Sequence, residues 1–256
     1  MLHFAFLDQF RDAIDFIFNQ RESISGEVQI GGLAEIGRFT AEHLLVSGIA
    51  IVAAVAVSVP IGLYLGHRGR GEFLAIGVSN VGRAVPSLAL LAFFLAYLGT
   101  GVVNVTTVLF LLAVPPILTN TYVGVRQVDP DTVDAARGMG MKDTQIVGKV
   151  RLPLALPTIF AGIRLSAVAV LATATIAPLA DVRTLGEPII SPQIYGDAGQ
   201  IGAAIVVALL TLAADAGIGG LQRAVTPKGL KLAAEAKGPR RRRFALTMPT
   251  RRERTI

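Results

Sequence analysis

Long stretches without charge divide this chain of 256 residues into apolar segments separated by short polar ones. Residues 44–66 carry no charged side chain, and about 20 apolar residues suffice for a helix to cross the hydrocarbon core of a bilayer. A second uncharged stretch, 84–125, is long enough for two such helices and is interrupted at Gly99-Thr100-Gly101. The pattern predicts membrane-spanning helices.

The spacing of the apolar stretches predicts an all-α membrane protein that crosses the bilayer about five times. We expect the spans near residues 44–66, 74–98, 102–123, 154–180 and 201–221. Several prolines lie within these spans, at positions 60, 86, 115, 116, 157 and 178. Packed membrane helices tolerate proline where neighbouring groups satisfy the freed carbonyl oxygens.

The composition agrees with this class, since 52% of the residues are hydrophobic and only 16% are charged. The chain has no cysteine, which excludes disulfides, thiolate metal sites and cysteine nucleophiles. Its histidines, His3, His43 and His67, are too scattered to form a metal cluster. We therefore expect no metal site and no cofactor in this chain.

The two ends of the chain differ in charge. Residues 1–42 form an acidic segment, in which aromatic and aliphatic residues recur near helical spacing, so part of it is expected on the membrane surface. The segment lacks the features of a cleaved secretory signal. Residues 43–222 form the membrane domain, and residues 223–256 form a basic tail with eleven Lys or Arg against two Glu.

The distribution of basic residues predicts the orientation, because short cytoplasmic loops are enriched in Lys and Arg. An outside N-terminus and a cytoplasmic C-terminus place the turn at 67–70, the loop at 126–151 and the tail on the cytoplasmic side. The tail is then explained by the same rule and by attraction to anionic membrane lipids, so we do not expect nucleic acid as a partner.

The polar segment 126–153 has the signals of two short helices. Asp129-Pro130-Asp131 favours a capped helix start, which predicts a helix over 131–139. Ala135, Ala136 and the glycines at 138 and 140 leave room for another surface to approach the backbone, and Gly140 permits a turn with positive φ. A second helix near 142–150 is expected to end at Leu152-Pro153, where the next span starts.

The order of small, flexible and rigid positions in this segment resembles the coupling loop of ABC importer permeases. The family pattern is Glu-Ala-Ala, three residues, Gly, nine residues, Ile, one residue and Leu-Pro. In this chain the matching positions are Asp134, Ala135, Ala136, Gly140, Val150, Leu152 and Pro153. Asp134 and Val150 depart from the pattern conservatively.

The resemblance implies a type I importer permease fold and a set of partners. The loop would dock into a groove on a separate ATPase subunit, which would bind the ATP and Mg, since this chain has no phosphate-binding Gly-x4-Gly-Lys-Ser/Thr loop. It would pair with a second permease subunit, identical or paralogous, and receive substrate from an extracytoplasmic binding protein. The expected location is a bacterial inner or plasma membrane.

Two further segments are similar to the osmoprotectant branch of these permeases, which carries glycine betaine, choline, carnitine and related compounds. They are residues 83–91 and 120–130, and the likeness continues through 152–157 and 161–164. It weakens at 178–183, where that branch is rich in glycine. A permease for methionine, a sulfonate or another small nutrient stays an alternative.

Four polar or kinking residues inside the spans are candidates for the translocation path. Arg164 and Asp215 are ionisable residues within apolar stretches, and we expect them to pair. Arg164 and Arg83 are alternatively interfacial residues whose charge reaches the headgroups. Pro86 and Ser87 either line the path or serve helix packing. An ion-coupled secondary transporter using Arg164 and Asp215, or a membrane scaffold, is a competing interpretation.

Overall fold

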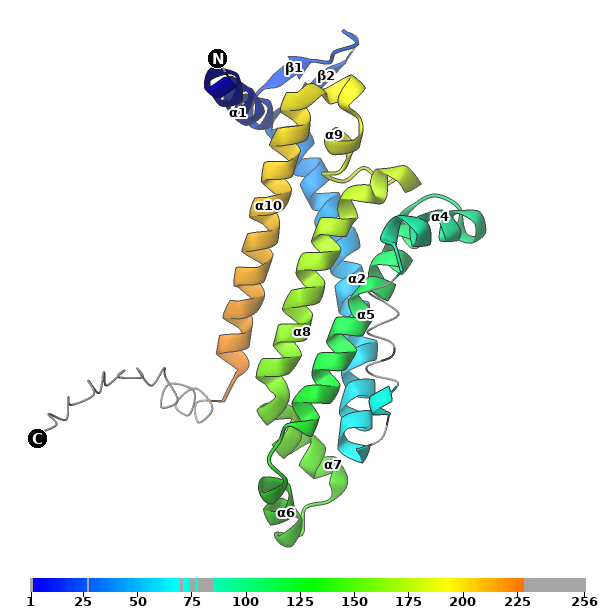
Figure 1. Cartoon of the computed structure of the whole chain (residues 1–256), viewed down its shortest axis with the longest axis vertical. Helices are drawn as coiled ribbons and strands as arrows, with labels where there is room; N and C mark the ends of the chain where they lie inside the picture. The colour runs from blue at the N-terminus through cyan, green and yellow to red at the C-terminus, as the bar shows by residue number, and fades with distance from the viewer. Residues whose placement is uncertain (1, 27, 70, 74–76, 78–84, 228–256) are drawn as a thin grey trace, which may run out of the picture.

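The computed structural model describes residues 2–26, 28–69, 71–73, 77 and 85–227, which form a bundle of long helices with a small hairpin at one end (Figure 1). Four helical runs in this part are long and apolar enough to cross a membrane: α2 (Gly32–Arg68), α5 (Val102–Arg126), the run Asp143–Ala180 and α10 (Pro192–Val225). The basic tail beyond residue 227 and Arg83 lie outside the described residues.

The remaining elements are short. The N-terminal end contains α1 (Leu2–Phe18) and an antiparallel pair of strands, β1 (Gln20–Glu22) and β2 (Gln29–Gly31). Between the long helices lie α4 (Ser87–Leu98), α6 (Pro130–Gly138) and α9 (Glu187–Ile190). The run Asp143–Ala180 consists of α7 (Asp143–Ile146), a π-helical turn η1 (Val147–Arg151), α8 (Leu152–Thr173) and a 3₁₀ segment η2 (Ala174–Ala180).

Four of the expected spans lie in long helices. The expected span at 74–98 does not correspond to a long helix in the described residues. Its described part is α4, a helix of 12 residues, whereas 74–76 and 78–84 lie outside the description. Pro86 was expected inside a helix, but it is the N-cap of α4, with ψ near 126°. Proline fits the start of a helix because its missing N–H would have no helical partner there. The break near residue 100 is confirmed: Gly99 and Gly101 have φ of 71° and 111°.

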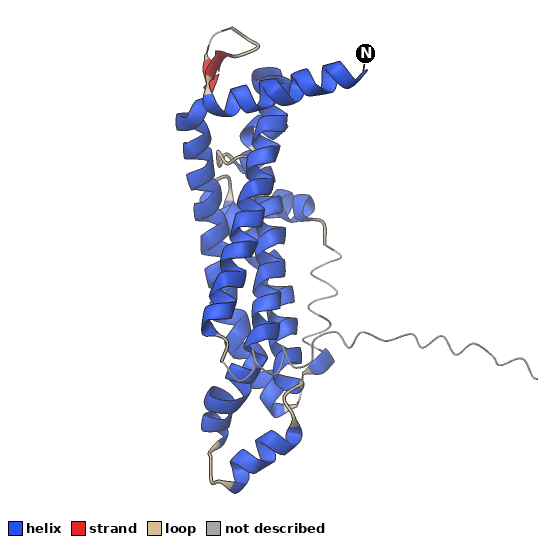
Figure 2. Ribbon diagram, turned by 90° about the vertical axis from the view of Figure 1, so that its left-hand side faces the viewer, coloured by secondary structure: helices blue, strands red, loops and turns tan. Residues whose placement is uncertain are grey.

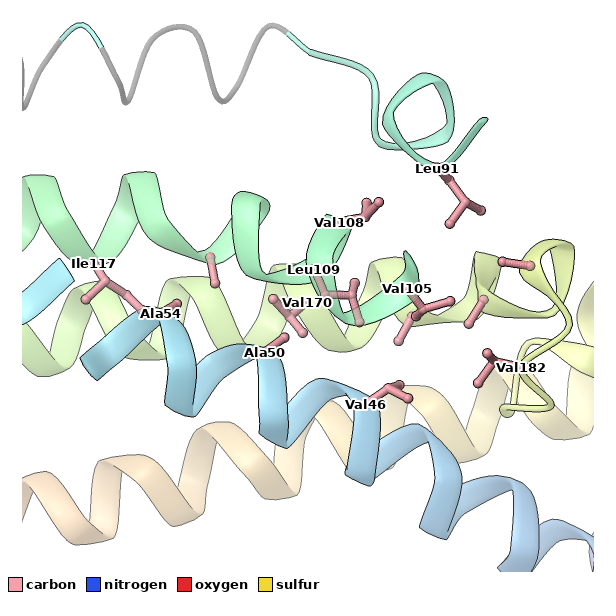
Figure 3. Packing of buried hydrophobic residues seen from close by; sticks show 14 residues of the cluster. Val46, Ala50, Ala54, Leu91, Val105, Val108, Leu109, Ile117, Val170 and Val182 are labelled. Atoms are coloured by element: carbon pink, nitrogen blue, oxygen red, sulfur yellow. The ribbon is translucent and has the colours of Figure 1, made fainter. Parts of the chain in front are cut away.

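The core is the packing of α2, α5 and α8, where Val46, Ala50 and Ala54 of α2 face Leu109 of α5 and Val170 of α8 (Figure 3). Glycines bring the helices close together. Four glycines face a side chain of the neighbouring helix, and a Cβ added to any of the four would lie under 3 Å from that side chain. The pairs are Gly62 with Thr121, Gly66 with Val125, Gly124 with Thr158 and Gly162 with Asn120. Small residues at such crossings are typical of membrane helices.

The N-terminal segment is joined to the bundle. Figure 2 shows α1 running across the end of the long helices. Its Phe16 is fully buried against α10, where the ring fits beside Gly199 and Gly202. The side chain of Glu35 accepts hydrogen bonds from Gly31 N (2.6 Å) and Tyr195 Oη (3.2 Å), so the start of α2 is tied to both the hairpin and α10. The last part of the acidic segment, residues 32–42, and the predicted first span form one helix, α2.

Phe16→Ala should release α1 from α10, because a cavity left by a buried phenylalanine costs about 3–5 kcal/mol. Amide hydrogen exchange in α1 should speed up strongly, while exchange in α2 and α5 stays slow. Phe18, on the same helix and 58% exposed, supplies the control, and Phe18→Ala should leave the exchange unchanged. Equal exchange in both variants would contradict this account of how α1 is held.

Candidate coupling segment and translocation path

The predicted capped helix is present as α6, at the end of the bundle opposite α1 (Figure 1). Asp129 is its N-cap, and its Oδ1 accepts a hydrogen bond from the N–H of Asp131 at 3.1 Å. Pro130 occupies the first turn, where its missing N–H has no helical partner to lose. The helix ends at Gly138, one residue earlier than expected.

Gly140 reverses the chain after α6. Its φ of 78° lies in the left-handed region, as expected, and a Cβ there would meet no atom within 4 Å. The turn is closed by bonds from Gly140 N to Arg137 O (2.9 Å) and from Met141 N to Ala136 O (3.2 Å). The requirement for glycine is therefore conformational and not steric.

The two alanines of the motif face opposite ways. Ala136 is buried with Val133 of α6 and Ile146 of α7, whereas Asp134 and Ala135 are exposed. At Ala136 the surface that approaches the small side chain belongs to this chain itself, because the turn at Gly140 folds α7 back over that side of α6. The open face of α6 consists of Asp131, Asp134, Ala135 and Gly138.

Charged side chains link α6 to the start of the next helix. Arg137 lies 3.6 Å from Asp134 and 3.8 Å from Asp143, and His67 Nε2 lies 3.6 Å from the Asp143 carboxylate. The Arg137, Asp134 and Asp143 side chains are more than half exposed. Exposed ion pairs contribute little to stability, so these contacts orient the segment, and its folding relies on the buried cluster.

The segment continues into α8 without a break, since η1 carries the helix from α7 to Leu152. The predicted start of the next span at Leu152-Pro153 is confirmed, because α8 begins at Leu152 with Pro153 in its first turn. The predicted end of the preceding helix there was wrong, because the π-helical turn continues into α8 and accommodates a residue without an N–H. Val150 packs on the buried cluster of α6 and α7, and Leu152 packs on the cluster formed by α5 and α8.

The expected pair of Arg164 and Asp215 is confirmed. Arg164 Nε and Nη2 donate to the two carboxylate oxygens of Asp215 at 2.7 and 2.6 Å, which joins α8 to α10 in a two-pronged arrangement. Gly219, one turn further along α10, leaves space for the guanidinium. Such geometry holds both charges in one orientation.

A cleft of about 420 Å³ opens between the start of α4 and the helices α5 and α8. Of the two path candidates there, Ser87 lines it, and Pro86 is not among its lining residues. The cleft also contains Leu112, Pro115 and Pro116 of α5. Because the two prolines lack N–H groups, the carbonyls of residues 111 and 112 have no helical donor. Leu165, Ala169 and Thr173 of α8 form the opposite wall.

Three features were not predicted from the sequence. The π-helical turn has no local signal beyond Pro153. Docking of α1 on α10 depends on contacts between residues far apart in the chain. The hydrogen bond that Ser166 Oγ of α8 donates to Ala113 O of α5 (2.9 Å) also joins residues far apart in the sequence. Within the described residues, no three His, Asp or Glu side chains form a group that could hold a metal ion.

Comparison with known proteins now assigns the class that this architecture defines. The model of the family described as "Binding-protein-dependent transport system inner membrane component" matches residues 58–231. The chain belongs to this family and is the membrane-spanning permease component of an ABC importer, in an inner membrane.

The proteins similar to this chain in sequence include transport permeases of three bacteria. The chain is 40% identical to the carnitine transport permease protein OpuCB of Listeria monocytogenes over 77% of this chain and 90% of that protein. It is 39% identical to the glycine betaine/carnitine/choline permease OpuCB of Bacillus subtilis, over 75% of this chain and 89% of that protein. It is 34% identical to the osmoprotectant import permease OsmY of Salmonella typhimurium over 60% of this chain and 65% of that protein.

A solved structure shares the fold. The structure titled as an inward-facing conformation of the MetNI methionine ABC transporter aligns with a TM-score of 0.66, over 76% of this chain and 98% of that chain. The identity of 19% makes this a likeness of fold alone.

Gly140→Ala should destabilise the turn after α6 by about 1–2 kcal/mol, because a left-handed backbone is costly for alanine. Amide exchange in α6 should rise about 5–30-fold. Gly138→Ala is the matched control, since Gly138 has a helical backbone and open space around it. Faster exchange in Gly138→Ala than in Gly140→Ala would contradict the assignment.

Asp215→Arg and Arg164→Asp should each lower the yield of folded protein, because each places two like charges between α8 and α10. The double exchange should recover most of it, and the coupling follows from a double-mutant cycle. Thermal unfolding of the four proteins in one detergent is the measurement. Additive effects of the two substitutions would show that the pair does not hold the helices together.

Proposed function

We propose that this chain is the permease of an ATP-driven importer for osmoprotectants that carry a quaternary ammonium group, such as glycine betaine, choline and carnitine. The single observation that carries the mechanism is the open, small-residue face of α6, fixed to a helical run that continues through the membrane domain. The substrate class is supported by relatives whose names specify these compounds and which this chain matches over most of their length.

The proposed orientation puts α6 in the cytoplasm and α1 outside. A cytoplasmic ATPase subunit, which holds ATP and Mg, would receive the face formed by Asp134, Ala135 and Gly138. A second permease subunit would complete the membrane pathway, and an extracytoplasmic binding protein would deliver substrate at the end that carries α1 and the hairpin. The basic tail, outside the described residues, would rest on anionic membrane lipids.

In this mechanism a displacement of α6 by the ATPase subunits leads to a movement of the membrane helices. Closure of the ATPase subunits displaces α6, and its buried contact with Ile146 passes the force to α7. Because α7, η1 and α8 are continuous, α8 moves as one rod, and the Arg164–Asp215 pair carries α10 with it. This chain performs no covalent chemistry.

The cleft beside Ser87 is the proposed part of the translocation path. It is mainly apolar, and its polar lining residues are Ser87 and Thr173, while Leu112, whose carbonyl loses its helical donor to Pro116, also lines it. A quaternary ammonium ion has no hydrogen to donate, so weak contacts with oxygens and apolar walls suit its passage. Strong binding is then left to the extracytoplasmic binding protein, in keeping with the absence of tryptophan from this chain.

The test is ATP-dependent uptake of labelled glycine betaine, choline and carnitine by vesicles that contain this chain, its ATPase and its binding protein. At least one compound should accumulate. Ala135→Trp, which places a bulky side chain on the exposed face of α6, should abolish uptake although the permease folds. Ala135→Ser, of similar size to alanine, should retain it.

The outcomes separate the parts of the proposal. Uptake of none of the three compounds by the unaltered complex would overturn the substrate class. Full uptake by Ala135→Trp would overturn the role of the α6 face, whatever the substrate is.

A further inference from the structure

A second cleft, of about 390 Å³, lies between the last turns of α2 and the α7–η1 segment. It is formed by Pro60, Leu63, Tyr64, His67 and Arg68 of α2 and by Asp143, Thr144 and Val147 on the other side. The cleft belongs neither to the open face of α6 nor to the translocation path, since it shares no residue with either.

The cleft changes polarity along its length. Pro60, Leu63 and Tyr64 end the uncharged stretch of α2, so this part lies at the depth of the hydrocarbon core or its edge. His67 and Arg68 follow directly and mark the headgroup region, where aromatic residues such as Tyr64 are enriched. A phospholipid has the same order of polarity, with acyl chains on one side and a phosphate on the other.

Arg68 supplies a positive charge at the rim. The Arg68 Cζ lies 5.4 Å from the centre of the Tyr64 ring, and Tyr64 is 59% exposed. Arg68 forms no salt bridge with any residue that the structure describes. Asp143, the acid of the cleft, is already within 4 Å of Arg137 and His67. The guanidinium of Arg68 is therefore available to an anionic group from the membrane.

Within the described residues, the contacts of α2 with α5 lie on a face other than the cleft. Gly62 and Gly66 turn a different face of α2 toward α5, and Gly71, after the end of α2, lies against Leu65, which is not part of the cleft. Pro60 and Tyr64 are exposed in the cleft.

We propose that this cleft is a binding site for an anionic phospholipid, with an acyl chain along Pro60, Tyr64 and Val147 and the phosphate at Arg68. One wall belongs to α2 and the other to the segment that joins α6 to α8. A lipid bound there stabilises the arrangement of the coupling segment relative to α2. The site needs only the membrane and this chain, so its test does not depend on the transported substrate.

The absence of tryptophan allows a direct measurement. Tyr64→Trp places a single fluorophore in the cleft and keeps an aromatic ring under Arg68. The full-length chain is reconstituted in bilayers that contain either phosphatidylglycerol or phosphatidylcholine brominated on the acyl chain, at equal mole fraction. Quenching by the bromine reports lipid and is silent to a free phosphate ion. Ile61→Trp, at a 45% exposed position of α2 outside the cleft, is the matched reporter.

Quenching in the Tyr64→Trp protein should favour the anionic lipid, and adding Arg68→Gln should reduce that preference about fivefold, the effect of one basic residue near a membrane surface. Arg126→Gln removes a charge at the same end of the bundle outside the cleft and should leave the preference intact.

Equal quenching of the Tyr64→Trp protein by both lipids would overturn the proposal. An equal anionic preference in the Ile61→Trp protein would also overturn it, because that result would indicate general attraction to the surface. Absence of quenching in the Tyr64→Trp protein would do the same, because it would indicate that protein covers the cleft.

Discussion

The close approach of α2, α5 and α8 is the constraint on which the rest of the structure depends. Lipid is as apolar as the helix surfaces, so burial of apolar area does not drive these helices together as it does in water. Glycines replace that driving force by allowing backbone-to-side-chain contact, and each Cβ added at Gly62, Gly124 or Gly162 would force two helices apart. The position of the coupling segment follows, because it is held between the last turn of α5 and the first turn of α8.

Rigidity at the start of α8 comes from its surroundings. A π-helical turn and a proline at the same place are usually signs of a kink. Here Arg151 Nη1 donates to Gly66 O of α2 at 3.3 Å, and Leu152 packs into the cluster of Val125 and Ala155. The turn is thus braced on two sides, by the hydrogen bond to α2 and by the apolar cluster of α5 and α8.

The sequence predicted what local signals encode. The Asp129-Pro130 cap, the positive φ at Gly140 and the long uncharged spans were all recognised, and so was the Arg164–Asp215 pair, because a lone charge in an apolar helix requires a partner. Features that depend on distant contacts were not. Ala135 and Ala136 are identical in sequence terms, and only the return of Ile146 over α6 decides which one is buried. The packing of Phe16 on α10 joins residues far apart in the sequence, Phe16 and Gly199.

α10 has the smallest buried share among the four long helical runs of the described chain, so its few specific contacts decide how it moves. At one end Phe16 and Tyr195 meet edge to face and tie it to α1, and along its length Asp215 ties it to Arg164. The Arg164–Asp215 pair is two-pronged, so it fixes the orientation of α10 relative to α8 more closely than single apolar contacts do. The contacts of α10 therefore connect α8, at Asp215, with α1 at the opposite end of the bundle. The N-terminal segment, which has no motif of its own, is in this way connected to α6 through α10, α8 and α7.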